Sequence, residues 1–421
     1  MDEITEEPTA LVERVAALDI GKATLTACVR VPHETKPGRR RQEVRTCATT
    51  TRSLLGLRDW LVCQGVTRVV MEATSAYWKP PFYLLEDDIA ECWVVNARDV
   101  KNVPGRPKTD KLDAVWLAKL AERGMLRPSF IPPRPQRQLR DLTRYRRTLT
   151  HERTREKQRT EKLLEDAQVK LSSVISDIFG KSGRDMLDAL IAGQRNPYAL
   201  AALARGTMRA KTSVLQEALT GHFTDHHGFL LAMMLSRIDA LTAQIGTLTA
   251  RIEQAIAPFA HQVAQLDEIP GIGIIAAQDL IAETGADMSR FPTPAHLVSW
   301  ARFAPKARQS AGRSKAATTG KGNPWLGGTL GESAAAAART STFLASRYKR
   351  IVKRRGKQRA LVAVGNSLLT IAWHLLSDPS ARFTDLGPTW HDRHTPQRRK
   401  RQLIAELERL SGMKVTLEEA A

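Results

Sequence analysis

The order of short apolar runs in the first hundred residues is the feature that most restricts the fold of this chain. Runs of β-branched residues alternate there with helical leucine spacing, and turn signals separate them. Strands are predicted at 15–20, 24–31, 43–49, 67–71 and 92–95, and helices at 54–61 and 82–85. The order strand, strand, strand, helix, strand, helix, strand is typical of an α/β layer.

The rest of the chain has helical periodicity. A helix is predicted at 111–123, and the prolines of 131–135 (IPPRP) favour an extended linker at which a domain ends. A basic helical stretch follows at 136–178, and near-heptad spacing predicts a second long helix at 229–257. These two helices can pair within one chain or between subunits. The predicted organisation is an α/β domain at 12–130, a helical coiled-coil region at 136–258, a mostly helical compact domain at 264–380 and a basic tail at 389–421.

The charge balance favours a polyanionic partner. Lys and Arg number 64 against 44 Asp and Glu, a net charge of +20, and such an excess points first to nucleic acid. No apolar run approaches the roughly 18 uninterrupted residues of a membrane-spanning helix, and the acidic N-terminus lacks the layout of a secretory signal. We expect a cytoplasmic protein without membrane contact. Its 4 Cys residues have no CxxC spacing and are expected to be reduced packing residues.

Four acidic residues are candidate metal ligands. Asp19 (ALDIGK) and Glu72 (VVME) lie at the C-terminal ends of two predicted strands, and the C-terminal ends of neighbouring strands share one edge of a sheet. Asp110 and Asp113 (KTDKLDA) lie three residues apart, on one face of the next helix. Clustered carboxylates need a cation to ionise together, and oxygen ligands select Mg²⁺ or Mn²⁺. The structural alternative makes Asp19 a turn residue, Glu72 a surface carboxylate and Asp110 an N-cap.

The segment IPGIGIIAAQDLIAETG at 269–285 has the form of a helix-hairpin-helix turn. Gly271 and Gly273 permit a tight backbone, and the free N–H groups of the following helix suit a phosphate. Contact with a DNA backbone is the functional interpretation. The alternative is a packing corner in which glycine allows close approach of two helices.

Ser310 lies in a basic segment, FAPKARQSAGRSKAATTGKGNPW, that is expected to form a loop over a phosphate backbone. A serine hydroxyl needs a base or a metal nearby to act as a nucleophile, and cations favour the charge that develops on a phosphoryl group. Ser310 is therefore either a nucleophile or a phosphate-binding serine, and Ser314, Thr318 and Thr319 compete with it. The expected nucleic-acid contacts are the basic residues of this segment and of a basic helix at 347–359: Lys306, Arg308, Arg313, Lys315, Lys321, Arg354 and Arg355.

These motifs occur in the order ALDIGK, MEAT, KTDKLDA, IPGIG, FAPKARQSAG and GKGNPW. With them the sequence resembles the transposases of the insertion-sequence 110 family, also called the 110/116/902 group, which are DEDD recombinases of bacterial mobile elements. The resemblance extends from Val15 to about Pro379. Two positions depart from the family pattern: Ala311 separates Ser310 from Gly312, and Gly327 stands where many relatives carry a basic residue, a contact that Arg339 could replace.

The resemblance implies an RNase H-like (RuvC-like) N-terminal domain, a coiled-coil middle and a mostly helical C-terminal transposase domain with a helix-hairpin-helix. It implies that Asp19, Glu72, Asp110 and Asp113 bind Mg²⁺ and that Ser310 is the catalytic serine. The reaction would be strand exchange through a covalent phosphoserine and a Holliday-type junction, in a homo-oligomer, a dimer or tetramer, that shares active sites between subunits. A structured bridge RNA would pair with donor and target DNA.

Two other functions remain open from the residues alone. One is a junction nuclease in which the acidic residues activate water, so that DNA is cut and not rejoined. The other is a non-catalytic nucleic-acid-binding protein whose acidic residues are structural. The nuclease would be indifferent to the hydroxyl of Ser310, and the binding protein would need no divalent metal.

Overall fold

The computed structural model describes residues 12–36, 38–96, 110–310, 313–390 and 396–416; for 110, 306–310, 313–318, 396–399 and 402 it describes the backbone alone. The chain divides into two compact units, Met1–Pro132 and Pro133–Ala421. The division falls within the proline-rich segment 131–135.

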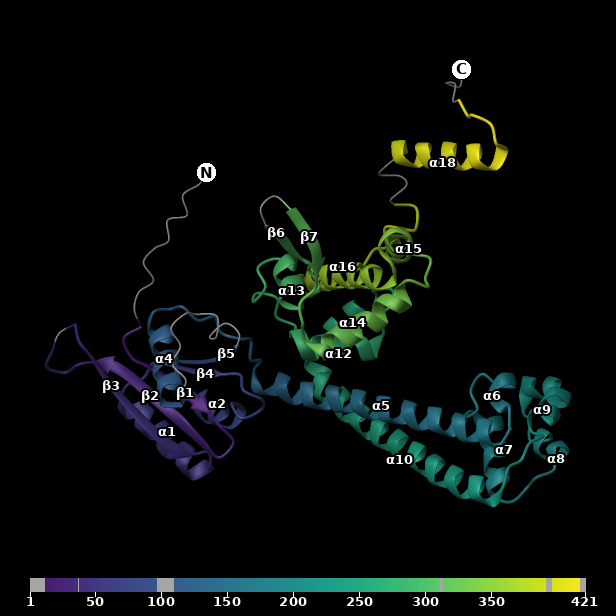
Figure 1. Ribbon diagram of the computed structural model, residues 1–421, viewed down its shortest axis with the longest axis horizontal. Coiled ribbons are helices and arrows are strands. Elements are labelled where there is room, and N and C mark those ends of the chain that lie inside the picture. Colours follow the sequence, from purple (N-terminus) through teal and green to yellow (C-terminus); the bar gives the residue numbers. More distant parts are fainter. Residues whose placement is uncertain (1–11, 37, 97–109, 311–312, 391–395, 417–421) are drawn as a thin grey trace. The chain divides into compact units, whose positions relative to one another are not determined.

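The first unit is built on a mixed sheet of 5 strands in the order β3-β2-β1-β4-β5 (Figure 1). The antiparallel part consists of β1 (Val15–Ile20), β2 (Thr24–Pro32) and β3 (Arg40–Ala48). β4 (Arg68–Glu72) pairs in parallel with β1, and β5 (Glu91–Val95) pairs in parallel with β4. Each predicted apolar run is a strand of this sheet, so the α/β prediction for the first part of the chain is confirmed.

Helices cover both faces of this sheet. On one face α1 (Thr51–Cys63) and α2 (Lys79–Leu85) pack against the side chains of alternate strand residues, among them Leu18 and Met71. On the other face α4 (Asp110–Glu122) packs against Ala17 and Val70. Because side chains alternate along a strand, residues two positions before or after Ala17 and Val70 also face α4.

The second unit begins with an arm of two long helices, α5 (Arg134–Asp166) and α10 (Asp225–Ile256), which pack against each other side by side (Figure 1). The near-heptad residues of α10 lie in this contact, and Leu231, Leu235 and Ile238 are buried. The pairing therefore takes place within one chain. The far end of the arm is closed by α6 (Leu171–Val174), α7 (Lys181–Ile191), α8 (Pro197–Ala201), the 3₁₀ turn η1 (Gly206–Lys211) and α9 (Thr212–Ala218).

The middle of α5 is mostly exposed. Its apolar stripe stops between His151 and Lys162, which predicts a segment that faces solvent or a ligand, and most residues there are exposed. Glu156 and Thr160 are the buried exceptions, and Glu156 pairs with Arg159 at 2.6 Å and with Arg237 of α10 at 3.7 Å. A polar seam continues the helix contact where apolar residues are missing.

The compact part of the second unit is helical around a second core. After the 3₁₀ turn η2 (Ala257–Phe259) come α11 (Ala260–Asp267), α12 (Ile274–Thr284), α13 (Pro294–Trp300), α14 (Pro324–Ala337), α15 (Phe343–Arg355) and α16 (Lys357–Ser377). Leu280, Leu330 and Leu368 are among the buried residues of this core. α18 (Pro396–Ser411) lies in the basic tail.

Two sequence predictions in this part are wrong. The expected loop around Ser310 is a hairpin of β6 (Lys306–Ser310) and β7 (Arg313–Thr318), which backbone hydrogen bonds can hold together without an apolar face. The basic helix predicted at 347–359 is two helices, because Gly356 adopts a φ of 79° and ends α15.

Two helices are long and apolar enough to cross a membrane by length and composition alone, Asp225–Asp267 and Lys357–Ser377. The first contains α10, which packs on α5, and the second is α16, whose Val364, Leu368 and Ala372 are buried in the core. These contacts bury part of each helix.

Candidate functional site

Asp19 and Glu72 occupy matching positions on two neighbouring parallel strands. The register of β1 and β4 pairs Val15 with Arg68 and Leu18 with Met71, so the next step along both strands brings Asp19 opposite Glu72. Both residues follow the alternation of Ala17 and Val70 and therefore face α4. Both are partly buried.

The direction of α4 places Asp113 at the same end of this sheet face as Asp19 and Glu72. The C-terminal end of α4 is fixed at the beginning of β1 and β4: the backbone N–H of Val12 donates to the carbonyl of Glu122 at 3.0 Å, and Arg68 donates to the carbonyl of Ala121 at 3.5 Å. α4 therefore runs antiparallel to these strands. Asp113 lies about 12 Å back along the helix from Ala121, and Asp19 lies about 13 Å along the strand from Val15, which brings the two to a similar level.

The acidic residues are not a closed cluster in the described part of the chain. Among the described side chains, no three His, Cys, Asp or Glu residues lie close enough together to hold a metal ion. The side chain of Asp110 lies outside that description. The fold thus gives Asp19, Glu72 and Asp113 a common face and a common end of the sheet.

Ser310 stands at the tip of the β6–β7 hairpin. It is the last residue of β6 and pairs with Arg313 of β7; Ala311, one of the two departures, lies outside the described residues. In the same register Arg308 pairs with Lys315.

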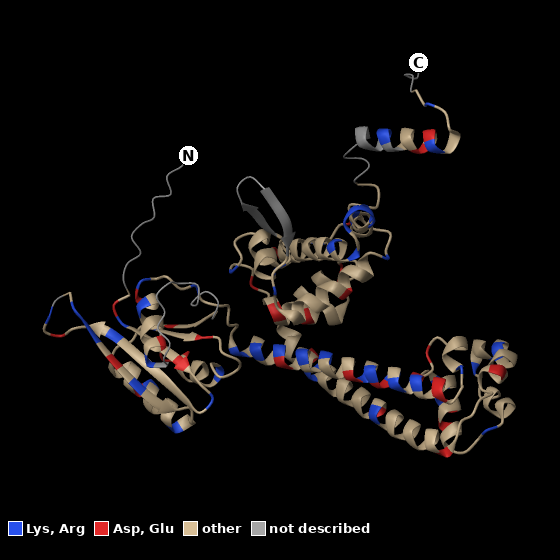
Figure 2. Cartoon of the chain, in the orientation of Figure 1, with Lys and Arg blue, Asp and Glu red and all other residues tan. Residues whose placement is uncertain are grey.

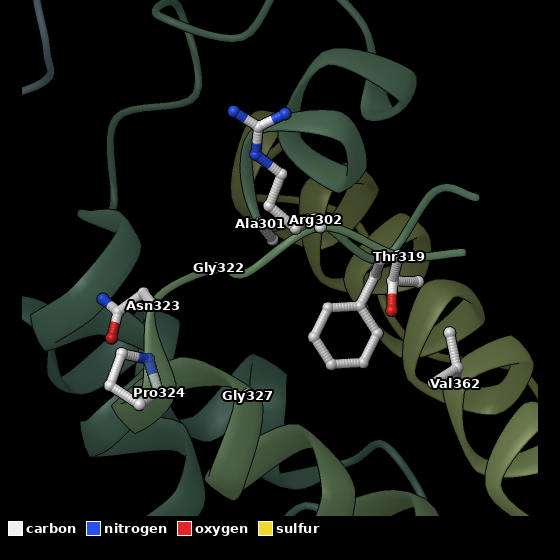
Figure 3. A pocket seen from close by; sticks show the side chains of 10 residues that line it. Ala301, Arg302, Thr319, Gly322, Asn323, Pro324, Gly327 and Val362 are labelled. Carbon is white, nitrogen blue, oxygen red and sulfur yellow. The ribbon is translucent and has the colours of Figure 1, made fainter. Parts of the chain in front are cut away.

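A pocket of ≈ 260 Å³ opens at the base of this hairpin (Figure 3). Gly320, Gly322 and Gly327 contribute backbone to it, and Arg302, which has a φ of 62°, lies beside them. A Cβ atom at Gly322 would come within 2.7 Å of the carbonyl of Ala301, so the close chain passage needs glycine there. The other residues around the pocket are Ala301, Phe303, Thr319, Asn323, Pro324 and Val362.

The second departure, Gly327, belongs to this pocket. A Cβ atom at Gly327 would meet nothing within 4 Å, so a longer side chain there would enter open space. Arg302 lines the same pocket as Gly327, whereas Arg339 lies beyond the opposite end of α14. Arg339 is therefore not positioned beside Gly327 to replace a basic side chain there.

The two glycines of IPGIG have different surroundings. Gly271 has a φ of 92°, and a Cβ atom there would come within 2.4 Å of the carbonyl of Ser333 in α14. Gly273 is exposed and precedes α12 with extended backbone. Gly271 is thus a close-packing glycine, and the exposed N–H groups lie at Gly273 and the first turn of α12.

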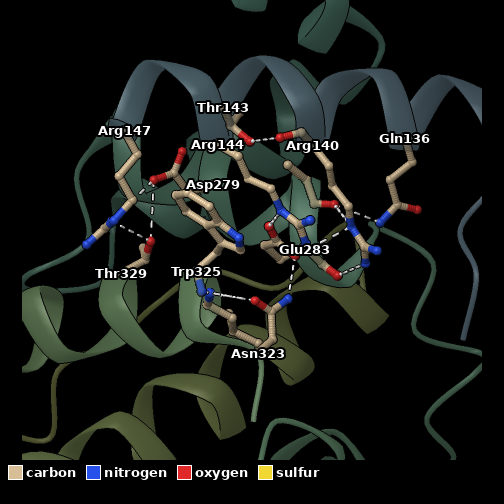
Figure 4. Close-up of polar contacts among 12 residues, drawn as sticks. Gln136, Arg140, Thr143, Arg144, Arg147, Asp279, Glu283, Asn323, Trp325 and Thr329 are labelled. Carbon is tan, nitrogen blue, oxygen red and sulfur yellow. Dashed lines mark hydrogen bonds and ion pairs between the residues drawn. The ribbon is translucent and has the colours of Figure 1, made fainter. Parts of the chain in front are cut away.

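Arginines of α5 bind carboxylates of α12 in a network that the sequence did not predict (Figure 4). Arg144 donates to both oxygens of Glu283, at 2.7 and 2.9 Å, and Arg140 lies 3.5 Å from the same carboxylate. Burial lowers the pKa of Arg140 to about 10, and Glu283 opposes this effect. Glu283 also accepts a hydrogen bond of 2.6 Å from Asn323.

Asn323 links this network to the segment after the hairpin. Its side-chain oxygen accepts from the backbone N–H of Trp325 at 3.0 Å and so caps α14. One turn farther along α5, Arg146 donates to Gln278 at 2.7 Å and to Asp279 at 3.1 Å, and Arg147 donates to Thr329 of α14 at 3.0 Å. The network fixes α5, α12 and α14 to one another.

Lys and Arg recur along α5 beyond this network, so that the helix keeps a basic surface (Figure 2). Lys321 is exposed in the segment that leads from the hairpin to α14, and Arg354 and Arg355 are exposed at the C-terminal end of α15. For Lys306, Arg308, Arg313 and Lys315 the structure gives the position in the hairpin and not the side chain.

Comparison with protein families matches two parts of the chain. Residues 16–168 match the model of DEDD transposases of the IS110 type, described as Transposase, and residues 263–349 match the model described as Transposase IS116/IS110/IS902 family. The two matches follow one another in the chain and together cover more than half of it. The chain belongs to the IS116/IS110/IS902 family of transposases. A comparison with curated proteins finds no match.

The family matches contain the candidate residues. Asp19, Glu72, Asp110 and Asp113 lie in the first match, and Gly271, Gly273, Ser310 and Lys321 in the second, whereas Arg354 and Arg355 lie just beyond it. Membership implies a DNA-processing enzyme that takes part in transposition and recombination, in a family that typically uses a divalent metal.

Proposed function

We propose that this transposase exchanges DNA strands by Mg²⁺-dependent (or Mn²⁺-dependent) chemistry in which Ser310 is the nucleophile. The observation that carries the proposal is the register of β1 and β4, which brings Asp19 opposite Glu72 on the face covered by α4. The mixed strand order β3-β2-β1-β4-β5 with α4 on that face supports an RNase H-like fold for the first unit.

The donor set suits a hard divalent cation. Asp19, Glu72 and Asp113 supply carboxylate oxygens alone, which are the ligands that Mg²⁺ prefers. With Asp110, which precedes Asp113 by one turn of α4, they would hold the metal in this family of enzymes. When bound, the metal would lower the pKa of an attacking hydroxyl and stabilise the charge on the leaving oxygen.

Ser310 would be the nucleophile and form the covalent intermediate. Its Oγ attacks the phosphorus of a phosphodiester, a bond from Oγ to phosphorus forms, and the bond from phosphorus to one deoxyribose oxygen breaks. The hydroxyl proton leaves Ser310 and a proton is returned to the departing deoxyribose oxygen. Because the phosphoserine ester retains the energy of the phosphodiester, a second deoxyribose hydroxyl can reverse the step without ATP.

The basic residues around Ser310 would hold the DNA backbone. Arg308, Lys315 and Arg313 lie on the same hairpin as Ser310, and cations there favour the charge on the phosphoryl group under attack. The exposed start of α12, an 11-residue helix, offers backbone N–H groups at Gly273 in the manner of a helix-hairpin-helix. Lys306, Lys321, Arg354 and Arg355 would add phosphate contacts that weaken with salt.

A guide RNA, an oligomer and a cytoplasmic, nucleoid-associated location complete the proposal. The motif order that resembles the bridge-RNA-guided transposases supports the RNA, and the charge of +20 suits two polyanionic partners. The RNA that co-purifies with the full chain from its host should be one structured species. Random RNA fragments would contradict the guided mechanism and leave the metal and serine chemistry untouched.

A strand-exchange assay separates this function from its rivals. With donor and target duplexes, the co-purified RNA and Mg²⁺, we expect joined products from the wild-type protein and none from S310A or D19N. A nuclease that uses water would give cut, unjoined DNA from S310A as from the wild type. A binding protein would give no product at all, and either result contradicts the proposal.

A further inference from the structure

α15 carries two arginines whose surroundings differ from those of its other cations. Lys353, Arg354 and Arg355 are exposed in the last turn of the helix, where the helix dipole favours positive charge without a partner. Arg347 and Arg350 lie in the middle of α15, three residues apart and so on one face, and both are partly buried.

The partly buried guanidinium groups of Arg347 and Arg350 have no counter-charge among the described residues. The Nε atoms of both guanidinium groups are inaccessible to solvent and have no hydrogen-bond partner in the structure, and within the described residues no carboxylate pairs with either side chain. Burial lowers the pKa of Arg347, and the neighbouring charge of Arg350 lowers it further. Two neighbouring cations thus each have one buried donor, the Nε–H, without a partner, which folding alone does not favour.

The other buried arginines of this unit show how the chain neutralises such charges. Arg140 and Arg144 face Glu283, and Arg146 faces Asp279. Each is a cation placed against a carboxylate of the same chain. Arg347 and Arg350 are exceptions to this pattern, so their counter-charge is expected from a ligand.

We infer that Arg347 and Arg350 together bind one phosphodiester of the DNA backbone. The planar guanidinium fork matches phosphate oxygens and can donate two hydrogen bonds at once, and DNA is the polyanion on which this transposase family acts. The site lies at the end of the second family match, and neither the acidic residues nor Ser310 belongs to it. It rests on the DNA-binding part of the proposed function and not on the chemistry.

The test compares two double variants with equal loss of charge from one helix. R347Q/R350Q removes the half-buried pair and R354Q/R355Q removes an exposed pair. Both are made in full-length S310A protein, and binding to a labelled 30-base-pair duplex is measured in EDTA over a range of salt, so no reaction can occur. A duplex of arbitrary sequence suffices, because phosphate contacts do not read bases.

We expect R347Q/R350Q to weaken DNA binding about 30-fold and to reduce the slope of log affinity against log salt by about 1. R354Q/R355Q should weaken binding about 5-fold or less. The unfolding temperature of R347Q/R350Q should be equal to or above that of the parent, because two unsatisfied charges have been removed. That combination of weaker binding and undiminished stability is not produced by a purely structural pair.

Equal losses in the two double variants would overturn the site, as would unchanged DNA binding in R347Q/R350Q. A loss of binding to the same duplex made of RNA, with DNA binding intact, would assign the pair to RNA and also refute the inference.

If the glutamine variant fails to fold, the lysine variant R347K/R350K replaces it, because lysine keeps both charges and lacks the guanidinium fork. R347K/R350K should bind DNA about tenfold more weakly than the parent. Parent-like affinity in the lysine variant would then contradict the inference. Failure of the S310A parent to bind any duplex would refute the proposed function as well.

Discussion

Arg144 of α5 holds the carboxylate of Glu283 in α12 through two hydrogen bonds, although 139 residues separate them in the chain. Glu283 in turn accepts from Asn323, the capping residue of α14. A single buried carboxylate therefore connects the base of the helical arm with the segment that follows the Ser310 hairpin.

Removal of this carboxylate should strongly destabilise the second unit. E283A leaves Arg140 and Arg144 without their counter-charge, and loss of one partner of a buried pair costs about 3–5 kcal/mol. The free energy of unfolding from urea titration measures the effect. The matched control is E332A, which also removes a carboxylate bound to an arginine, Arg147, but one whose side chain is 69% exposed; it should cost less than about 1 kcal/mol. Equal costs would show that the Glu283 network does not hold the helices together.

Gly271 and Gly273 should respond differently to the same substitution. G271A places a methyl group within 2.4 Å of the Ser333 carbonyl at a left-handed backbone position and should lower the free energy of unfolding by about 3 kcal/mol. G273A, where the nearest atom lies 4.0 Å away, should cost less than about 1 kcal/mol. Both are measured by urea titration. A G271A protein as stable as the wild type would contradict the close packing of Gly271 on α14.

The carboxylates of the first unit should bind divalent metal as a set. In 10 mM Mg²⁺ the unfolding temperature of the wild-type protein should rise by about 3 °C, because tenfold excess over the dissociation constant contributes about 1.4 kcal/mol. D19N, E72Q and D113N should each lose this rise. D59N, which removes an acid whose side chain is 64% exposed on α1, should keep it. A rise that persists in all three variants would place the metal elsewhere.

The sequence predicted the parts of the site that local pattern controls. Asp19 and Glu72 could be assigned to strand ends because apolar runs, VAAL and VVM, precede them, and both runs are buried in strands. Their shared edge then followed from parallel pairing. The direction of α4, which brings Asp113 to that edge, depends on contacts such as Arg68 with the Ala121 carbonyl, and no periodicity contains that information.

The sequence could not predict how the arginines of α5 are used. Arg144, Arg146 and Arg147 look like nucleic-acid contacts in a basic helix, but they bind Glu283, Asp279 and Thr329 from segments more than a hundred residues away. The hairpin was missed for a related reason. Its residues have little apolar character in the sequence, and strand prediction relies on an apolar alternation that is absent there.

The cysteines of the first unit should differ in reactivity with pH. Burial raises the pKa of Cys28 to about 11 and that of Cys92 to about 12, whereas Cys63 is exposed. At pH 8 only about one Cys28 in a thousand is thiolate, the form that reacts. Mass spectrometry after brief alkylation should therefore show modified Cys63 and unmodified Cys28 and Cys92.

The same raised pKa values fix the direction of a stability change. The folded state holds these thiol protons more tightly than the unfolded state does, so the contribution to stability is complete below about pH 9 and is lost as pH rises toward 11. Modification of Cys28 in folded protein at pH 8, at a rate similar to that of Cys63, would contradict its burial under α4.

The covalent intermediate tests the central claim most directly. The full-length protein is incubated with labelled donor and target duplexes, the co-purified RNA and Mg²⁺, denatured, and resolved on a gel for DNA that migrates with protein. A labelled adduct should form with wild-type protein and S314A, be absent from S310A and from reactions with EDTA, and map to the peptide that contains Ser310. An adduct that persists in S310A, or joined DNA without any protein adduct, would contradict the account.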